Sequence, residues 1–242
     1  LQAFACFCLL SSTVYIFNDL LDVQRDKIHP LKKKRPIASG QLPFPIATFA
    51  MIFGFFLSLF LAANISFFFF LTCLLYLLLH LTYTIYLKQI PIMDVLAIAS
   101  GFILRVWAGA VAVDAHISVW LLLCVVSFSL FMAVGKRRCE ATLLKEVAAK
   151  HRQALLFYSE TLLDVYTTMF ATASWLTYAL FTFSQPSAVE QGRFLPLMAI
   201  LPRTLVAQKW QMITVPLVIY GVMRYLQLVF EGKGGSPEDI LL

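Results

Sequence analysis

The sequence predicts an all-α protein, a polytopic bundle of about seven transmembrane helices in a single domain over residues 1–242. Two observations lead to this prediction. Of the 242 residues, 60% are hydrophobic and only 13% are charged, with a mean hydropathy of +0.82, whereas about a quarter of a soluble domain is charged. The apolar runs are continuous and do not alternate with polar residues, which favours membrane helices over a β-barrel.

Seven segments are apolar enough to cross a bilayer, which takes about 20 residues of helix. They are residues 1–17, 44–63, 66–86, 92–113, 118–134, 162–183 and 210–230. The first segment starts inside an apolar run, and the last residues of the chain turn apolar again. We therefore expect a domain that is incomplete at both ends, with at least one helix missing before it and one after it.

The basic residues are divided unequally between the two sides of this predicted bundle. Fifteen of the 19 Lys and Arg residues lie around residues 17–43, 86–91, 135–161 and 224–242. Three lie in the opposite loops, and Arg105 lies within a span. Because Lys and Arg concentrate in cytoplasmic loops, we expect a multi-pass protein of the cell (inner) membrane whose polar segments face the cytoplasm. The net charge of +6 then reflects topology, and we expect no nucleic-acid partner.

The first polar segment carries the strongest chemical signal. Three carboxylates and a carboxamide follow the first apolar run within nine residues, namely Asn18, Asp19, Asp22 and Asp26. Residues three and four apart share one face of a helix. Oxygen ligands grouped in this way suit Mg2+, which keeps some waters and also takes phosphate oxygens. These four residues are therefore the predicted metal ligands.

A basic run follows these acids and includes Lys34 and Arg35. Pro36 and Gly40 mark a turn that is expected to fold the run back over the acids, where it suits a diphosphate. The alternative is a solvated loop in which neighbouring basic residues only neutralise the acids. The metal–diphosphate interpretation is favoured because acidic side chains next to hydrocarbon are costly and usually mark function.

A second polar cluster lies between the third and fourth spans. Tyr83, Tyr86 and Lys88 close the third span and Asp94 opens the fourth. The tyrosines are either substrate contacts or interface anchors, and Lys88 is either a site residue or a positive-inside residue. A carboxylate such as Asp94 requires a cation or a metal there. Arg105 lies about three turns further along the same helix, on nearly the same face, and either binds substrate or pairs with an acid inside the bundle.

The third basic segment contains Lys136, Arg137 and Arg152, together with Glu140. The basic side chains are candidates for holding phosphates, and Glu140 is a candidate metal ligand or base-orienting group. The alternative is that this segment only satisfies topology or contacts anionic lipid. All three segments are expected on one side of the membrane, around one polar cavity for a strongly anionic ligand, with the membrane as the entry route for a lipid co-substrate.

The motifs resemble those of the UbiA-type membrane prenyltransferases. The resemblance rests on Asn18-Asp-x-x-Asp22-x-x-x-Asp26 and on the basic loop Lys34-Arg-Pro-Ile-Ala-Ser-Gly40. Most of that superfamily has Asp-x-x-x-Asp in the second motif, whereas this chain has Tyr83-x-x-Tyr86-Leu-Lys88 followed by Asp94. This variant is similar to the decaprenyl-phosphate phosphoribosyltransferase branch. So are residues 101–109, 131–137 and 224–242.

The resemblance implies a bundle of nine spans, of which the seven here are the second to the eighth, and a catalytic site with Mg2+ as cofactor. It also implies transfer of 5-phosphoribosyl from phosphoribosyl diphosphate to a polyprenyl phosphate of the decaprenyl type, with release of diphosphate and inversion at C1. The implied catalytic residues are Asp19, Asp22, Lys88 and Asp94. The implied substrate-binding residues are Lys34, Arg35, Tyr83, Tyr86, Arg105, Lys136, Arg137, Glu140 and Arg152.

Two alternatives remain at this point. One is a prenyltransferase that moves an isoprenoid from its diphosphate to an aromatic ring or haem, which shares the first motif but is expected to carry the paired aspartates in the second. The other is a membrane transporter. Transporters tend to show internal repeats and interrupted helices at the midplane, whereas here no repeat is visible and the polar residues crowd one interface, which favours an enzyme.

Overall fold

The computed structural model describes residues 1–28, 32–143, 157–185 and 210–231, and every regular element in these ranges is a helix. The chain forms two compact units. The first comprises Leu1–Ile117 with Leu144–Ser159, and the second Ser118–Leu143 with Glu160–Leu242.

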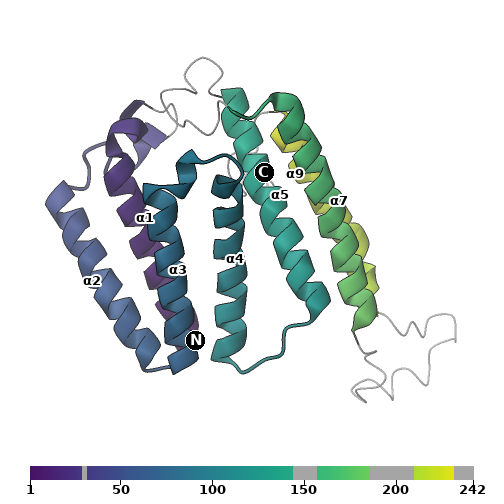
Figure 1. Cartoon of the computed structure of the whole chain (residues 1–242), viewed down its shortest axis with the longest axis horizontal. Helices are drawn as coiled ribbons and strands as arrows, with labels where there is room; N and C mark the ends of the chain where they lie inside the picture. Colours follow the sequence, from purple (N-terminus) through teal and green to yellow (C-terminus); the bar gives the residue numbers. More distant parts are fainter. Residues whose placement is uncertain (29–31, 144–156, 186–209, 232–242) are drawn as a thin grey trace, which may run out of the picture. The chain divides into compact units, whose positions relative to one another are not determined.

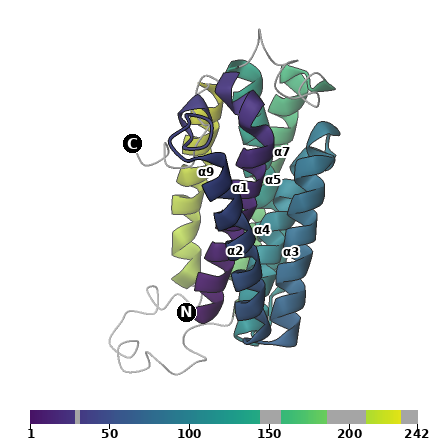
Figure 2. The ribbon, with the colours of Figure 1, turned by 90° about the vertical axis from the view of Figure 1, so that its left-hand side faces the viewer.

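The first unit contains four long helices and two short 3-10 helices. In chain order these are α1 (Gln2–Ile28), η1 (Lys32–Lys34), α2 (Phe44–Ala63), α3 (Phe67–Ile85), η2 (Leu87–Gln89) and α4 (Met93–Ala112). Helix α1 packs against α2 and α3, and α3 packs against α4. The four helices run alternately up and down (Figure 1), and the side view shows their axes roughly aligned (Figure 2). The end of α1, the start of α2, the end of α3 and the start of α4 therefore lie at the same end of this unit.

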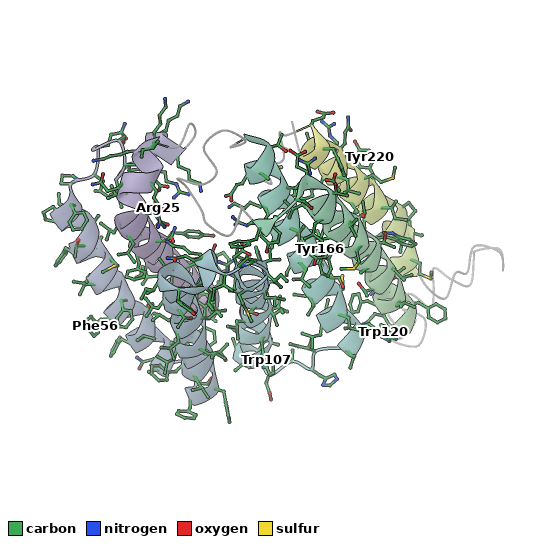
Figure 3. All side chains as sticks on the ribbon, turned by 45° about the horizontal axis from the view of Figure 1, so that its top comes forward. Arg25, Phe56, Trp107, Trp120, Tyr166 and Tyr220 are labelled. Carbon is green, nitrogen blue, oxygen red and sulfur yellow. The ribbon has the colours of Figure 1, made fainter. Side chains whose placement is uncertain are left out.

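Helix α2 shows why these segments pack as membrane helices. One of its faces is exposed and carries Phe49, Phe53, Phe56 and Phe60; Figure 3 shows Phe56 on the outer side of the helix. The opposite face is buried and carries the small residues Ala47, Gly54, Ser58 and Ala62. A Cβ atom on Gly54 would lie 2.5 Å from the hydroxyl of Thr13 on α1. Small residues at such contacts let membrane helices approach closely, while the phenylalanines face lipid.

The second unit contains α5 (Val119–Leu143), α7 (Glu160–Ser184), η4 (Trp210–Thr214) and α9 (Val215–Phe230). Its three long helices all contact one another around a core of Phe131, Cys139, Ala171, Val222, Tyr225 and Val229. Gly135 allows α5 and α9 to approach, because a Cβ atom there would lie 2.8 Å from the ring of Tyr225.

The helices follow the predicted spans with two kinds of difference. All seven predicted spans are long helices in the described residues. Six of them are also long and apolar enough to cross a membrane by length and composition, and α7 is not among the six. Threonines along α7 and the acids Glu160 and Asp164 lower its hydropathy. In addition, α1 and α5 continue about ten residues past their predicted ends, because ion pairs three residues apart, such as Arg25–Asp22, support helix beyond the apolar run.

Candidate active site

The acidic motif forms the last turns of α1, and two of its carboxylates, Asp19 and Asp26, share one basic partner. Arg35 donates from Nη1 to Asp19 Oδ1 at 2.6 Å and to Asp26 Oδ2 at 2.9 Å. Asp19 and Asp26 are seven residues apart, two helical turns, and so share one face. One guanidinium thus bridges both ends of the motif.

The loop that carries Arg35 is held against α1 by its own turn. Leu42 N donates to Pro36 O at 2.9 Å, and Gly40 has a φ of 82°, a conformation that glycine adopts without strain. The side chain of Ile37 is buried in a cluster shared by α1 and α2. The predicted fold-back of the basic run over the acids is therefore present.

Lys88 reaches the middle carboxylate of the motif from a different part of the chain. Its Nζ lies 2.7 Å and 2.9 Å from the two oxygens of Asp22. Its side chain is only 7% exposed, and that of Asp22 is 17% exposed. Helix α3 ends at Ile85, and η2 turns Lys88 inward toward α1. Arg25 (Figure 3) is a second, more exposed partner of Asp22 at 3.5 Å.

We call the three carboxylates and their three cations the carboxylate cluster; its members are Asp19, Asp22, Asp26, Arg25, Arg35 and Lys88. These side chains carry formal charges that cancel. Asn18 lies half-buried next to Asp19, and Lys34 lies exposed on η1. Within the described ranges, no group of three or more His, Cys, Asp or Glu side chains is arranged like metal ligands. The ion pairs of Asp19, Asp22 and Asp26 given above are with basic side chains of the protein.

Asp94 lies in the first turn of α4, six residues after Lys88, and is completely buried. Its Oδ1 accepts a hydrogen bond from the Tyr158 hydroxyl at 2.9 Å. The same hydroxyl accepts the backbone N–H of Ile92 at 2.5 Å. A carboxylate at a helix N-terminus is also stabilised by the helix dipole. The Tyr158 hydroxyl and the N-terminus of α4 are thus two partners of this buried carboxylate.

Arg105 is half-buried on α4, and its guanidinium contacts a phenol. Its Nη2 donates to the Tyr76 hydroxyl at 2.7 Å, and its guanidinium lies over the rings of Tyr76 and Phe102. The ion pairs found in the described part of the chain do not include Arg105. The alternative that it pairs with an acid inside the bundle is therefore not observed there.

The two tyrosines of the second motif differ in their surroundings. Tyr86 caps the C-terminus of α3 and is 64% exposed, as an interface anchor would be. Tyr83 is half-buried, with its ring packed edge-on against His80. Their predicted contacts with substrate remain predictions.

The third predicted segment belongs to the second unit. Arg137 is 2% exposed and pairs with Glu140 one turn later on α5, whereas Lys136 is exposed. Arg152 lies outside the described residues.

Sequence reasoning did not select the neighbouring Arg138, which donates from Nε to Asp164 at 2.5 Å and lies 3.5 Å from Glu160. It joins the end of α5 to the start of α7. The sequence does contain a sign of this contact, because a basic residue ends one predicted helix and two acids stand at the start of the next.

The fold and the carboxylate cluster can now be compared with known proteins. The family model described as the UbiA prenyltransferase family matches residues 1–229. The chain belongs to this family. It is 35% identical to the decaprenyl-phosphate phosphoribosyltransferase of Mycolicibacterium smegmatis, over 99% of this chain and 73% of that protein. It is also 35% identical to the decaprenyl-phosphate phosphoribosyltransferase of Corynebacterium glutamicum, over 99% of this chain and 68% of that protein.

Solved UbiA structures share the fold. A UbiA homolog from Archaeoglobus fulgidus bound to GPP and Mg2+ matches with a TM-score of 0.70 at 19% identity, covering 99% of this chain and 80% of that one. A UbiA homolog from Aeropyrum pernix K1 in its apo form matches with a TM-score of 0.70 at 15% identity, covering 99% and 82%. The predicted UbiA family, the all-α fold and the multi-pass membrane character are thereby confirmed. As a UbiA family member the protein is a transferase, which excludes the transporter alternative.

Proposed function

We propose that this UbiA protein transfers 5-phosphoribosyl from phosphoribosyl diphosphate to a polyprenyl phosphate of the decaprenyl type and releases diphosphate. The observation that carries the proposal is the 35% identity over 99% of the chain to decaprenyl-phosphate phosphoribosyltransferases. The Lys88–Asp22 pair supports it, because this lysine occupies the second motif where most UbiA enzymes are expected to carry aspartates. We also propose that the site faces the cytoplasm, on the side where most of the Lys and Arg residues lie.

The carboxylate cluster is suited to the diphosphate of the donor. Lys88 and Arg35 each hold carboxylate oxygens at hydrogen-bond distance, and phosphate oxygens accept the same bonds from the same donors. We propose that the diphosphate lies between these two cations. Its oxygens then replace those of Asp22 as the hydrogen-bond acceptors of Lys88 Nζ. Negative charge that grows on the leaving diphosphate is then met by groups already in position.

A divalent cation fits this arrangement on charge and donor chemistry. The carboxylate cluster is neutral by itself, so an added diphosphate would leave it with an excess of negative charge. Mg2+ commonly binds one or two carboxylates and completes its shell with water and substrate phosphates, so a set of three protein ligands is not required. We propose that Asp19 and Asp22 hold the ion, supported by Asn18 and Asp26. When bound, Mg2+ neutralises charge on the diphosphate.

The transfer itself needs little more from the protein than position. The bond from ribose C1 to the diphosphate oxygen breaks, and the electron pair leaves with the diphosphate. A phosphate oxygen of the lipid forms the new bond to C1 from the opposite face, which inverts that carbon. A phosphate monoester has a second pKa of about 6, so the acceptor is ionised near neutral pH and no strong base is needed.

The remaining predicted residues are proposed to orient the two substrates. Asp94 is proposed to hold the ribose hydroxyls or a second metal. In the first unit, Lys34 is proposed beside Arg35 at the diphosphate, Tyr83 and Tyr86 as substrate contacts, and Arg105 at one of the other phosphates. Lys136, Arg137, Glu140 and Arg152 are proposed as substrate-binding residues on their sequence alone, with Glu140 for a metal or the ribose hydroxyls. Arg105 has the clearest physical case, because a cation within a membrane-spanning helix is costly and usually marks a functional site.

The test supplies the purified protein with decaprenyl phosphate, Mg2+ and one labelled donor. We expect label from phosphoribosyl diphosphate to enter the lipid fraction with release of one diphosphate per transfer, and no turnover of a labelled prenyl diphosphate. Asp22→Asn provides the inactive control. Consumption of the prenyl diphosphate in place of phosphoribosyl diphosphate would instead establish the prenyltransferase alternative.

A further inference from the structure

The connection between η2 and α4 contains a strained turn. Ile92 has φ 69° and ψ −45°, and Met93 N donates to Pro91 O at 2.8 Å across it. A hydrogen bond from residue i+2 back to residue i around a positive φ is the γ-turn of the rare, strained type. A β-branched residue at positive φ is a genuine outlier, and such outliers persist only where surrounding structure holds them.

The group that holds this turn is the hydroxyl of Tyr158. It accepts the N–H of Ile92 itself at 2.5 Å and donates to the buried Asp94 at 2.9 Å. One oxygen therefore ties the centre of the turn to the first turn of α4. Tyr158 lies 66 residues after Ile92 in the sequence and is 8% exposed, so this contact is part of the folded interior of the first unit.

The turn joins two residues of the proposed site. Lys88 lies in η2, four residues before Ile92, and Asp94 lies two residues after it. The chain between them is short, so the backbone conformation at Ile92 determines how η2 is oriented relative to α4. A relaxed turn would displace Lys88 relative to Asp22, although no side chain at the carboxylate cluster had changed.

We propose that Tyr158 is a positioning residue that clamps the strained turn at Ile92 and thereby sets the placement of Lys88 and Asp94 for the reaction. This inference rests on the proposed function for its effect on turnover. Its structural content, that the phenol oxygen holds the turn, does not depend on which substrate is used.

The first test needs no substrate. Hydrogen–deuterium exchange is followed in peptides covering residues 88–96 of the full chain, in wild type, Tyr158→Phe and Tyr220→Phe. Loss of the acceptor for Ile92 N–H is expected to speed exchange there about tenfold. Tyr220 is 70% exposed on α9, so Tyr220→Phe removes a phenol oxygen that lies away from the turn. Exchange at residues 88–96 in this variant should equal that of wild type. Unchanged exchange in Tyr158→Phe would overturn the proposal.

The second test is a cycle with Ile92→Gly, because glycine adopts positive φ without strain and Ile92 is 52% exposed, so little packing is lost. We expect Tyr158→Phe to lower kcat/KM for the donor about tenfold or more, as small misplacements at active sites do, with the KM for the lipid unchanged. In the Ile92→Gly background the same change should cost less than about threefold. An equal loss in both backgrounds would show that Tyr158 does not act through the turn at Ile92 and would overturn the proposed clamp.

The two tests separate failure of this proposal from failure of the proposed function. If wild type turns over a prenyl diphosphate instead, the phosphoribosyl assignment is wrong, and the exchange measurement still decides the role of Tyr158. Because Ile92→Gly does not depend on the clamp for folding, the double variant keeps the test available even if Tyr158→Phe alone is recovered in low yield. In that case, rescue of its yield by Ile92→Gly supports the proposal, and no rescue counts against it.

Discussion

The Lys88–Asp22 pair allows stability and catalysis to be separated by three variants, Asp22→Asn, Lys88→Met and the double variant. Both side chains are largely buried, and two charged hydrogen bonds of 2.7 Å and 2.9 Å join them. Removing either partner leaves the other charge inside the protein. Removing both leaves a neutral amide beside an apolar side chain of similar length.

The expected magnitudes follow from this burial. Breaking a buried pair on one side costs about 3–5 kcal/mol. Asp22→Asn should lower the free energy of unfolding by about 3 kcal/mol, the low end of this range, because the amide oxygen still accepts one hydrogen bond from Lys88. Lys88→Met should cost less, because Arg25 remains 3.5 Å from Asp22. The double variant should lie within about 1 kcal/mol of wild type, since replacing a whole buried pair with neutral residues is often nearly neutral.

Unfolding in detergent measures the stability of each variant, and turnover of labelled phosphoribosyl diphosphate measures its catalytic activity. The double variant should recover stability and remain inactive, with kcat at least about a thousandfold below wild type, because both a proposed metal ligand and a proposed phosphate donor are gone. Strictly additive stability losses would show that the pair is not coupled. Turnover within tenfold of wild type in Asp22→Asn would refute the role of this carboxylate in the reaction.

Three further predictions use other contacts. Arg35→Gln should raise the KM for the donor about tenfold or more in steady-state assays, with Lys33→Gln on the exposed face of η1 as the unaffected control; an unchanged KM would remove Arg35 from the site. Gly135→Ala should lower the free energy of unfolding by about 1–3 kcal/mol because its methyl would lie 2.8 Å from the Tyr225 ring, whereas Gly109→Ala, with nothing within 4 Å, should be neutral or stabilising. Equal stability of these two alanine variants would contradict the close approach of α5 and α9. Ser66→Ala should cost about 1 kcal/mol in the same unfolding assay, because the Ser66 side chain accepts the Phe69 N–H at the start of α3, and no loss would mean that this cap contributes nothing.

The parts of the fold that could be predicted from sequence are those with a local cause. Helix α2 was predicted to the residue, because Pro43 precedes a continuous apolar run that Asn64 closes. The approach of Arg35 to the acids was predicted because Pro36 and Gly40 mark the turn that brings it back. Length and hydropathy could not decide whether α7 crosses the membrane, because its threonines also form ordinary helix.

The contacts that could not be predicted join residues far apart in the sequence. Lys88 was expected on the same side as Asp22, but nothing local indicates that they bond directly across 66 residues. The same holds for Tyr158, whose hydroxyl bonds to a turn 66 residues earlier. Arg105 was expected to contact either a substrate or an acid, whereas its partner in the structure is the hydroxyl of Tyr76. This contact could not be predicted, because a tyrosine in an apolar run gives no sign of its partner.

The account depends on the basic side chains that now hold the carboxylates being the same ones that receive the donor. A structure determined with phosphoribosyl diphosphate and Mg2+ bound tests this most directly. It should show the diphosphate beside Asp19 and Asp22, with Lys88 Nζ moved from the Asp22 oxygens onto a phosphate oxygen. A structure in which Lys88 keeps both of its bonds to Asp22 while the donor lies elsewhere would contradict it.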